Sequence, residues 1–171
     1  MSKGYVHLYT GNGKGKTTAV FGLAVRAACA GKRVYIGQFI KGMKYSETGI
    51  ADVLENIEIE QLGRTCLLDK APEKIDIDKA LEGLRRCEEI IASGEYDLVI
   101  LDEVTIPIYL KMFTDEDVIS LLKKKPEEVE IALTGRYAPE SFNPYCDLIT
   151  EMKEVKHYYS QGVLSREGID V

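Results

Sequence analysis

The amino-acid sequence predicts a single α/β domain built on a mostly parallel β-sheet with helices on both faces. Three observations predict this fold class. Short apolar runs of strand length alternate with longer amphipathic segments along the chain. One of the runs is apolar without interruption, as in a strand buried on both faces, and no internal repeat or low-complexity tract divides the chain. We therefore expect residues 1–171 to form one domain.

The first half of the chain predicts three strands and two helices in alternation. Short strands are expected at residues 5–9 and 33–39, and the segment between them, 17–30, is rich in Ala, Leu and Val and predicts a helix. A third strand is expected at 57–62. Apolar residues then recur at helical spacing from 77 to 91, which predicts an amphipathic second helix.

The second half of the chain continues this alternation. Residues 98–101, with the sequence Leu-Val-Ile-Leu, predict the central strand of the sheet. A further helix is expected from about 114 to 124, because Pro126 stops it. Strands are expected at 129–134 and 147–150.

The composition narrows the class of protein. Hydrophobic residues make up 45% and charged residues 29%, as in globular proteins rather than disordered or membrane ones. The N-terminus lacks the apolar core of a signal peptide and no run is long enough to cross a membrane, so we expect a cytoplasmic protein. A net charge of −6 argues against binding to nucleic acid. The four cysteines form no CxxC pair, which predicts reduced thiols rather than a zinc site.

The segment "GNGKGKTT", residues 11–18, predicts a phosphate-binding loop between a strand and a helix. Small residues let backbone N–H groups turn toward an anion, and the positive end of the helix dipole faces it. Lys16 is expected to reach the terminal phosphates and the Thr17 hydroxyl to sit on Mg²⁺. The usual pattern G-x-x-x-x-G-K-[ST] would place its first glycine where this sequence has Thr10, so Gly11 comes one residue late. This departure suggests an unusual pose for the nucleotide.

Two further stretches predict partners for this loop. Asp102 and Glu103 follow the apolar central strand, and one of them is expected to hold Mg²⁺ directly or through water. Another strand ends at "TGR", where the guanidinium of Arg136 suits contact with a phosphate oxygen.

Four stretches, in order, carry a resemblance that spans nearly the whole chain. They are "TGNGKGKTTAVFGLAVRAACAGKRVYIGQFIKG", "LVILDEV", "LTGRYAPE" and "KHYYSQGVLSREGID". Together they closely resemble the ATP:corrinoid adenosyltransferase family that makes adenosylcobalamin, in its phosphate-loop branch. The resemblance implies a P-loop NTPase-like, recombinase-like fold. It also implies transfer of the 5′-deoxyadenosyl group of ATP to the Co(I) centre of a corrinoid, with release of triphosphate, in adenosylcobalamin biosynthesis or salvage.

The resemblance also implies the site. Family members bind ATP in the reverse direction, with the ribose 5′ carbon toward the corrinoid, which would account for the late glycine. Lys16 and Glu103 are implied as catalytic residues, and Thr17, Glu103 and Asp102 as ligands of Mg²⁺. The residues implied to hold ATP are Gly11, Asn12, Gly13, Lys14, Gly15, Lys16, Thr17, Thr18 and Arg136. A homodimer and a flavoprotein reductant are implied as partners.

On the corrinoid side the sequence departs from the family. Relatives use aromatic residues of a "GFTW"-like segment to displace an axial ligand of Co(II), whereas the matching residues 63–66 here are Gly-Arg-Thr-Cys. Residues 67–68, both leucine, or Phe39 or Tyr45 would provide an apolar face instead, unless they are ordinary packing residues. His157 matches a family histidine, with a place either in the corrinoid pocket or in the structure alone. The N-terminal extension that covers the site in some relatives is expected to be missing.

Three other functions remain open on the sequence alone. A phosphate-loop ATPase with Glu103 activating water would release ADP and phosphate. A small-molecule kinase with Asp102 or Glu103 as general base would release ADP and a phosphorylated product. A nucleotide sensor or corrinoid carrier would form no product. Inorganic triphosphate is the product expected only of the adenosyltransferase.

Overall fold

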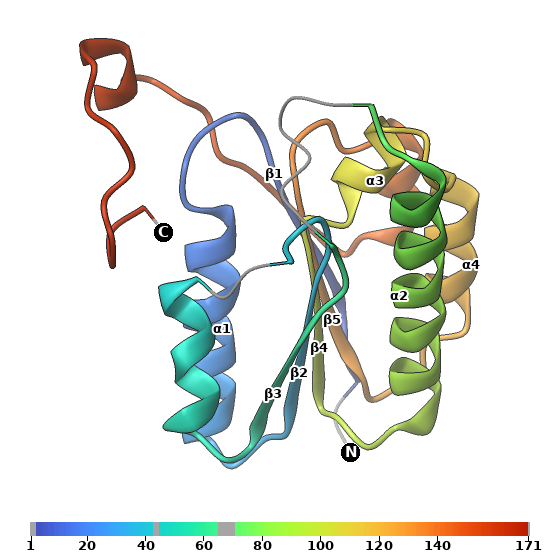
Figure 1. Ribbon diagram of the computed structural model, residues 1–171. Coiled ribbons are helices and arrows are strands. Elements are labelled where there is room, and N and C mark those ends of the chain that lie inside the picture. The colour runs from blue at the N-terminus through green and yellow to red at the C-terminus, as the bar shows by residue number, and fades with distance from the viewer. Residues whose placement is uncertain (1–2, 43–44, 65–70, 171) are drawn as a thin grey trace.

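The structure is a computed structural model that describes residues 3–42, 45–64 and 71–170 (Figure 1). Its strands form one six-stranded sheet in the order β3-β2-β4-β5-β1-β6, and every neighbouring pair is parallel. The predicted α/β class is confirmed, with a sheet that is parallel throughout its described strands. These strands are β1 (Val6–Thr10), β2 (Val34–Gln38), β3 (Ile57–Gln61), β4 (Leu98–Asp102), β5 (Glu130–Thr134) and β6 (Leu148–Glu151).

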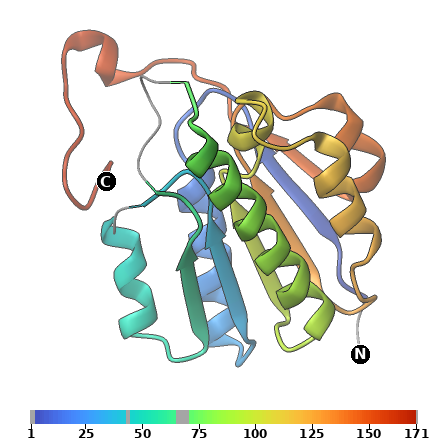
Figure 2. The same ribbon diagram turned by 45° about the vertical axis from the view of Figure 1, so that its right-hand side comes forward.

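Helices cover both faces of this sheet, as predicted (Figures 1 and 2). The helix α1 (Lys16–Cys29) packs on one face, and α2 (Lys74–Ser93) and α4 (Asp115–Lys123) pack on the other. The sequence patterns did not predict the short helix α3 (Thr105–Tyr109). They also gave no sign of three 3₁₀ helices, η1 (Ser46–Asp52), η2 (Glu140–Tyr145) and η3 (Tyr158–Gln161).

Side-chain alternation along the strands divides the core into two layers. On β4, which is buried along its whole length, Leu98 and Ile100 join the layer under α1, whereas Val99 and Leu101 join the layer under α2 and α4. This explains why the β4 sequence is apolar without a break, since both of its faces are covered.

The strands β1 and β2 are parallel but not neighbours, because β4 and β5 lie between them. The helix α1 therefore crosses over those two strands on its way from β1 to β2. As a consequence, the carboxyl ends of β2, β4 and β5 gather under the loop that begins α1. Polar residues at these carboxyl ends build the site described below.

Two negative findings concern the described residues. No helix among them combines the length and apolar character needed to cross a lipid bilayer. Cys29, Cys87 and Cys146 are free thiols, in agreement with the prediction, and burial raises the pKa of Cys146 to about 11. Cys66 lies outside the described part of the chain.

Candidate functional site

The position of the first glycine follows from where β1 ends and the loop to α1 begins. Thr10 is still the last residue of β1, and its Oγ1 donates a hydrogen bond to the carbonyl oxygen of Gly135 at 3.0 Å. The turn begins one residue later, at Gly11, which has a φ of 100°. A Cβ at Gly11 would lie 2.4 Å from the carbonyl oxygen of Met152, so a side chain is excluded there for steric as well as conformational reasons.

The segment that follows β6 braces the outer side of this loop. The Gly13 N–H donates to the Met152 carbonyl at 2.7 Å, and the Glu154 N–H donates to Oδ1 of Asn12 at 3.1 Å. Asn12 and Gly13 are thus engaged with protein. Within the described ranges, the N–H groups of Lys14 and Gly15 have no protein acceptor. With the first turn of α1, which begins at Lys16 and exposes Thr18, they provide N–H groups free to bind an anion.

Lys16 lies across the inside of the loop. Its Nζ donates to the carbonyl oxygens of Gly11 at 2.9 Å and Gly13 at 2.8 Å, and the side chain is buried. Burial lowers the pKa of Lys16, and the positive charge of Arg136 lowers it further. An anion on the loop would oppose both effects and raise the pKa of Lys16, since it adds a negative charge beside the ammonium.

The C-terminal segment runs past the start of α1 (Figure 1), and Lys14 makes its contacts with that segment rather than inside the loop. Its Nζ donates to the Tyr158 hydroxyl at 2.8 Å, to the Ile169 carbonyl at 2.8 Å and to the Asp170 carboxylate. Hydrogen bonds from Lys14 and Tyr158 hold the pKa of Asp170 below its usual range. The role of Lys14 in holding ATP stays a prediction, and its side chain here serves the C-terminal segment.

Under the loop, four neighbouring strands each end on a polar residue, and we call this set the polar row: Gln61 of β3, Gln38 of β2, Asp102 of β4 and Thr134 of β5. Asp102 is completely buried in it. Its Oδ1 accepts hydrogen bonds from Thr17 Oγ1 at 3.0 Å and Thr134 Oγ1 at 2.7 Å. Its Oδ2 accepts from Gln38 Nε2 and Lys41 Nζ, both at 3.2 Å. Each carboxylate oxygen has two lone pairs, and all four therefore accept a hydrogen bond.

The other acidic residue, Glu103, is in a different situation. Its backbone N–H donates to Thr134 Oγ1 at 2.8 Å with a φ of 63°, but its carboxylate accepts no hydrogen bond from any described residue. Burial and the neighbouring Asp102 charge raise the pKa of Glu103, although Lys41, Lys16 and Arg136 act in the opposite direction. Glu103 therefore has oxygen lone pairs to spare, whereas Asp102 does not.

These two environments decide which residues fit Mg²⁺. The Thr17 hydroxyl donates its hydrogen bond to Asp102, so the lone pairs of its oxygen are free for another partner. Hydroxyl and carboxylate oxygens are the hard ligands that Mg²⁺ prefers, often only one or two from the protein with phosphates supplying others. Among the described residues, no group of three or more His, Cys, Asp or Glu side chains forms a metal cage. Thr17 and Glu103 fit the ion, and Asp102 fits a supporting place behind Thr17.

Arg136 is brought to the same edge by a tight backbone contact. Gly135 has a φ of 145°, and a Cβ there would lie 2.0 Å from Thr105 Oγ1. That hydroxyl donates to the carbonyl oxygen of Arg136 at 2.6 Å, which fixes the start of the loop after β5. The exposed guanidinium makes no hydrogen bond to a described residue, but its charge acts on both Lys16 and Glu103.

The residues considered for the corrinoid side are only partly described. Residues 65–68 lie outside the described ranges, and Arg64 makes an ion pair with Asp76 at 3.2 Å. Phe39 is completely buried in an edge-to-face contact with Phe113, with ring centroids 5.9 Å apart, so it is a packing residue. His157 is the N-cap of η3, where its Nδ1 accepts from the Tyr159 N–H at 3.0 Å. This capping contact gives His157 a structural role at the start of η3.

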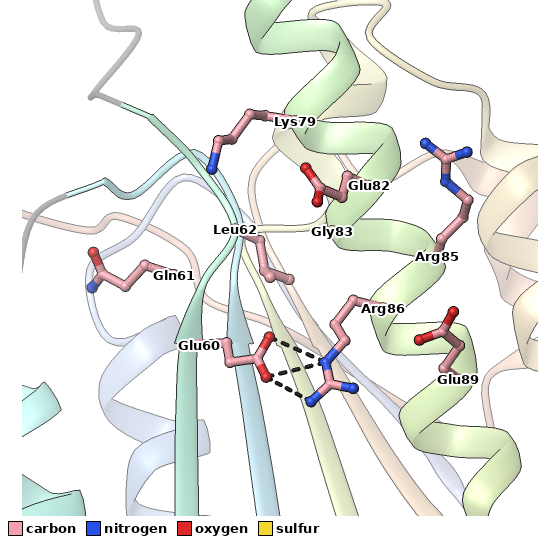
Figure 3. A pocket seen from close by; sticks show the side chains of 9 residues that line it. All are labelled: Glu60, Gln61, Leu62, Lys79, Glu82, Gly83, Arg85, Arg86 and Glu89. Carbon is pink, nitrogen blue, oxygen red and sulfur yellow. Dashed lines mark hydrogen bonds and ion pairs between the residues drawn. The ribbon is translucent and has the colours of Figure 1, made fainter.

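A groove of about 430 Å³ lies elsewhere, between β3 and α2 (Figure 3). Figure 3 shows Leu62 turned toward α2 and Gln61 turned away from it, as the strand alternation requires. An ion pair of Glu60 with Arg86 at 2.8 Å crosses the groove. The polar row points to the α1 face, so this groove is not part of the site under the loop.

Comparison with known proteins agrees with the predicted resemblance. Residues 2–171 match the family described as "ATP:corrinoid adenosyltransferase BtuR/CobO/CobP". A corrinoid adenosyltransferase of Escherichia coli (strain K12) is 32% identical over 170 residues, which cover 98% of this chain and 86% of the relative. Corrinoid adenosyltransferase CobA of Salmonella typhimurium is also 32% identical, with the same coverage. A corrinoid adenosyltransferase of Sinorhizobium sp. is 30% identical over 98% of this chain and 80% of its own length.

Proposed function

Since this chain belongs to the ATP:corrinoid adenosyltransferase family, we propose that its loop grips the triphosphate of ATP so that the ribose 5′ carbon faces a reduced corrinoid. The electron pair of Co(I) forms the bond to C5′, the C5′–O5′ bond breaks, and its electron pair leaves on the triphosphate. The observation that carries this proposal is the convergence of the loop, the Asp102–Glu103 pair and Arg136 at one edge of the sheet.

The protein residues in this mechanism align the substrates and neutralise charge, because Co(I) is already a strong nucleophile. Lys16 and the free N–H groups of the loop would hold the triphosphate, and Arg136 would contact it from the far side. Thr17 and Glu103 would hold Mg²⁺, with Asp102 behind Thr17. When bound, Mg²⁺ would neutralise negative charge on the departing triphosphate.

The partners form a separate part of the proposal. A homodimer and a flavoprotein that reduces the corrinoid follow from family resemblance, as does the choice of Mg²⁺ over other divalent ions. Sedimentation measurements at several protein concentrations would test the dimer directly. A monomer at all of them would contradict it.

The test of the function is the identity of the phosphate product. The protein is incubated without oxygen with MgATP and chemically reduced cobalamin, while the Co(I) absorbance and the phosphate species are followed. We expect the Co(I) signal to disappear in step with formation of inorganic triphosphate, and no reaction without the reductant. ADP with phosphate would support the ATPase instead, and ADP with a phosphorylated acceptor would support the kinase. ATP binding without product would support a sensor or carrier.

A further inference from the structure

The segment "QFIKG", residues 38–42, supplies two side chains to the site that the proposed mechanism has not yet used. Gln38 is the last residue of β2 and is completely buried. Lys41 follows the strand, and its side chain is only 15% exposed. A buried amide and a nearly buried ammonium at one strand end need specific partners, and both find Oδ2 of Asp102.

The strand register explains how Gln38 reaches Asp102. Gln38 is paired with Gln61 on β3 and with Asp102 on β4, so the three side chains project side by side from the same face. Gln61 Nε2 donates to Gln38 Oε1 at 3.1 Å, and Gln38 Nε2 donates to Asp102 Oδ2 at 3.2 Å. The opposite amide orientation would set an oxygen against the carboxylate and two NH₂ groups against each other. Gln38 therefore has one orientation, with its donor on Asp102.

A strained turn brings Lys41 to the same oxygen. Ile40 has a φ of 64°, a conformation that β-branched residues rarely adopt. A Cβ at Gly63 would lie 2.6 Å from the carbonyl carbon of Ile40, so the two backbones approach closely there. The turn returns the Lys41 ammonium over the strand end, 3.2 Å from Asp102 and 3.2 Å from Glu47. Strain of this kind persists where the surroundings enforce it, which is often at functional sites.

We infer that Gln38 and Lys41 are positioning residues, which occupy Oδ2 of Asp102 and so leave Oδ1 to accept from the hydroxyls of Thr17 and Thr134. Because the Thr17 hydroxyl donates its hydrogen bond to Asp102, its oxygen lone pairs face in a fixed direction toward the metal ion that accompanies the triphosphate. The ammonium of Lys41 also balances the buried carboxylate. The inference rests on the proposed function, since it assigns Thr17 a place beside the ion.

The test measures metal affinity apart from turnover, with Mn²⁺ as the probe and its binding to the enzyme–ATP complex followed by electron paramagnetic resonance. We expect Lys41→Met to weaken Mn²⁺ binding by about 10-fold or more, as loss of an outer partner of a metal ligand usually does. Gln38→Asn, which keeps the polarity but shortens the reach of the amide, should weaken it similarly. Lys41→Arg should restore most of the affinity. At saturating metal, kcat should fall much less than the affinity.

A matched control separates this role from a structural one. Glu47→Gln removes the negative charge of the other partner of Lys41 and leaves the contact with Asp102 in place, so its Mn²⁺ affinity should equal that of the unmodified protein. Folded Lys41→Met and Gln38→Asn proteins with unchanged Mn²⁺ affinity would overturn the inference. A loss in Glu47→Gln as large as in Lys41→Met would also overturn it. If the unmodified protein makes ADP rather than triphosphate, the proposed function fails instead.

Discussion

Two clusters of hydrogen bonds hold the segment of residues 11–18, one from inside the protein and one from outside. The inner cluster is the polar row, where Asp102 binds Thr17 and is completely buried. The outer cluster lies on the C-terminal segment, where Asp170, whose side chain is 11% exposed, binds Lys14, whose side chain is 39% exposed. In each cluster a carboxylate binds a residue of the segment 11–18, but only the inner carboxylate is completely buried, and the lysine of the outer pair is open to water.

This difference predicts how the two clusters respond to change. When a buried carboxylate loses its hydrogen-bond donors, no water can take their place. The same holds for buried donors that lose their carboxylate. An exposed ion pair is screened by salt and replaced readily by solvent. The inner cluster should therefore control stability and chemistry, and the outer cluster should control only the position of the C-terminal segment. The predictions below test this division, beginning with the largest effect.

The largest effect is expected from Lys16→Ala, which removes the ammonium on the inner side of the loop. The triphosphate would lose its nearest fixed positive charge, so kcat/KM for adenosylation should fall by at least about 10²–10³-fold. Lys14→Ala removes a lysine two residues away that is held by the C-terminal segment, and its loss should be much smaller. Anaerobic rates of triphosphate release measure both. Equal losses in the two variants would contradict the division into an inner and an outer cluster.

Asp102→Ala should have the largest effect on folding. The change leaves the nearly buried ammonium of Lys41 without its main partner and three further donors unsatisfied, so the free energy of unfolding should fall by about 3–5 kcal/mol. Urea unfolding without nucleotide measures it. The comparison is Asp170→Ala, whose urea midpoint should stay close to that of the unmodified protein, since the charged side chains that bind Asp170, Lys14 and Arg166, are 39% and 50% exposed. A midpoint for Asp102→Ala near the unmodified value would show that the polar row adds little stability.

Glu103→Gln should act on metal binding and stability in opposite directions. Burial raises the pKa of Glu103, so its ionised form opposes folding, and stability should fall as the pH rises from the ordinary carboxyl range through the raised pKa. The uncharged glutamine removes this pH dependence and should raise the thermal midpoint at neutral pH without metal. Metal affinity should fall by more than the roughly 10–100-fold that loss of an outer-shell partner usually costs, because Glu103 is proposed to bind the ion directly. A lower midpoint in the variant would contradict this account of Glu103.

The fold and the site differ in how much of each could be predicted from the sequence. The fold followed from apolar periodicity, since strands and long helices bury regular faces. The tight turn between β1 and α1 followed from glycine spacing, because few backbones besides this one need glycines at those positions, and phosphate binding by this loop stays a prediction. The short helices α3, η1, η2 and η3 have too few turns to show a period, so their existence depends on tertiary contacts.

For the site, the sequence named candidate residues but did not predict how their surroundings differ. Asp102 and Glu103 are adjacent and have the same charge, so the sequence alone did not decide which of them holds Mg²⁺. Their difference arises from the register of β2, β4 and β5, which brings donors to Asp102 and none to the Glu103 carboxylate among the described residues. The signal for Gln38 and Lys41 was present in "QFIKG", but only the sheet order shows that both reach Asp102.

The smallest effect is expected from Asp170→Asn, which weakens the outer cluster alone. Lys14 and Tyr158 hold the pKa of Asp170 low, so this contact persists above the ordinary carboxyl range and is lost only as the pH falls through the lowered value. At neutral pH the variant should show faster hydrogen exchange over residues 152–170, most clearly at low salt where the ion pair is least screened. The KM for ATP should change by less than about twofold. A large rise in that KM would mean that the C-terminal segment shapes the nucleotide site, and the outer cluster would then belong with the inner one.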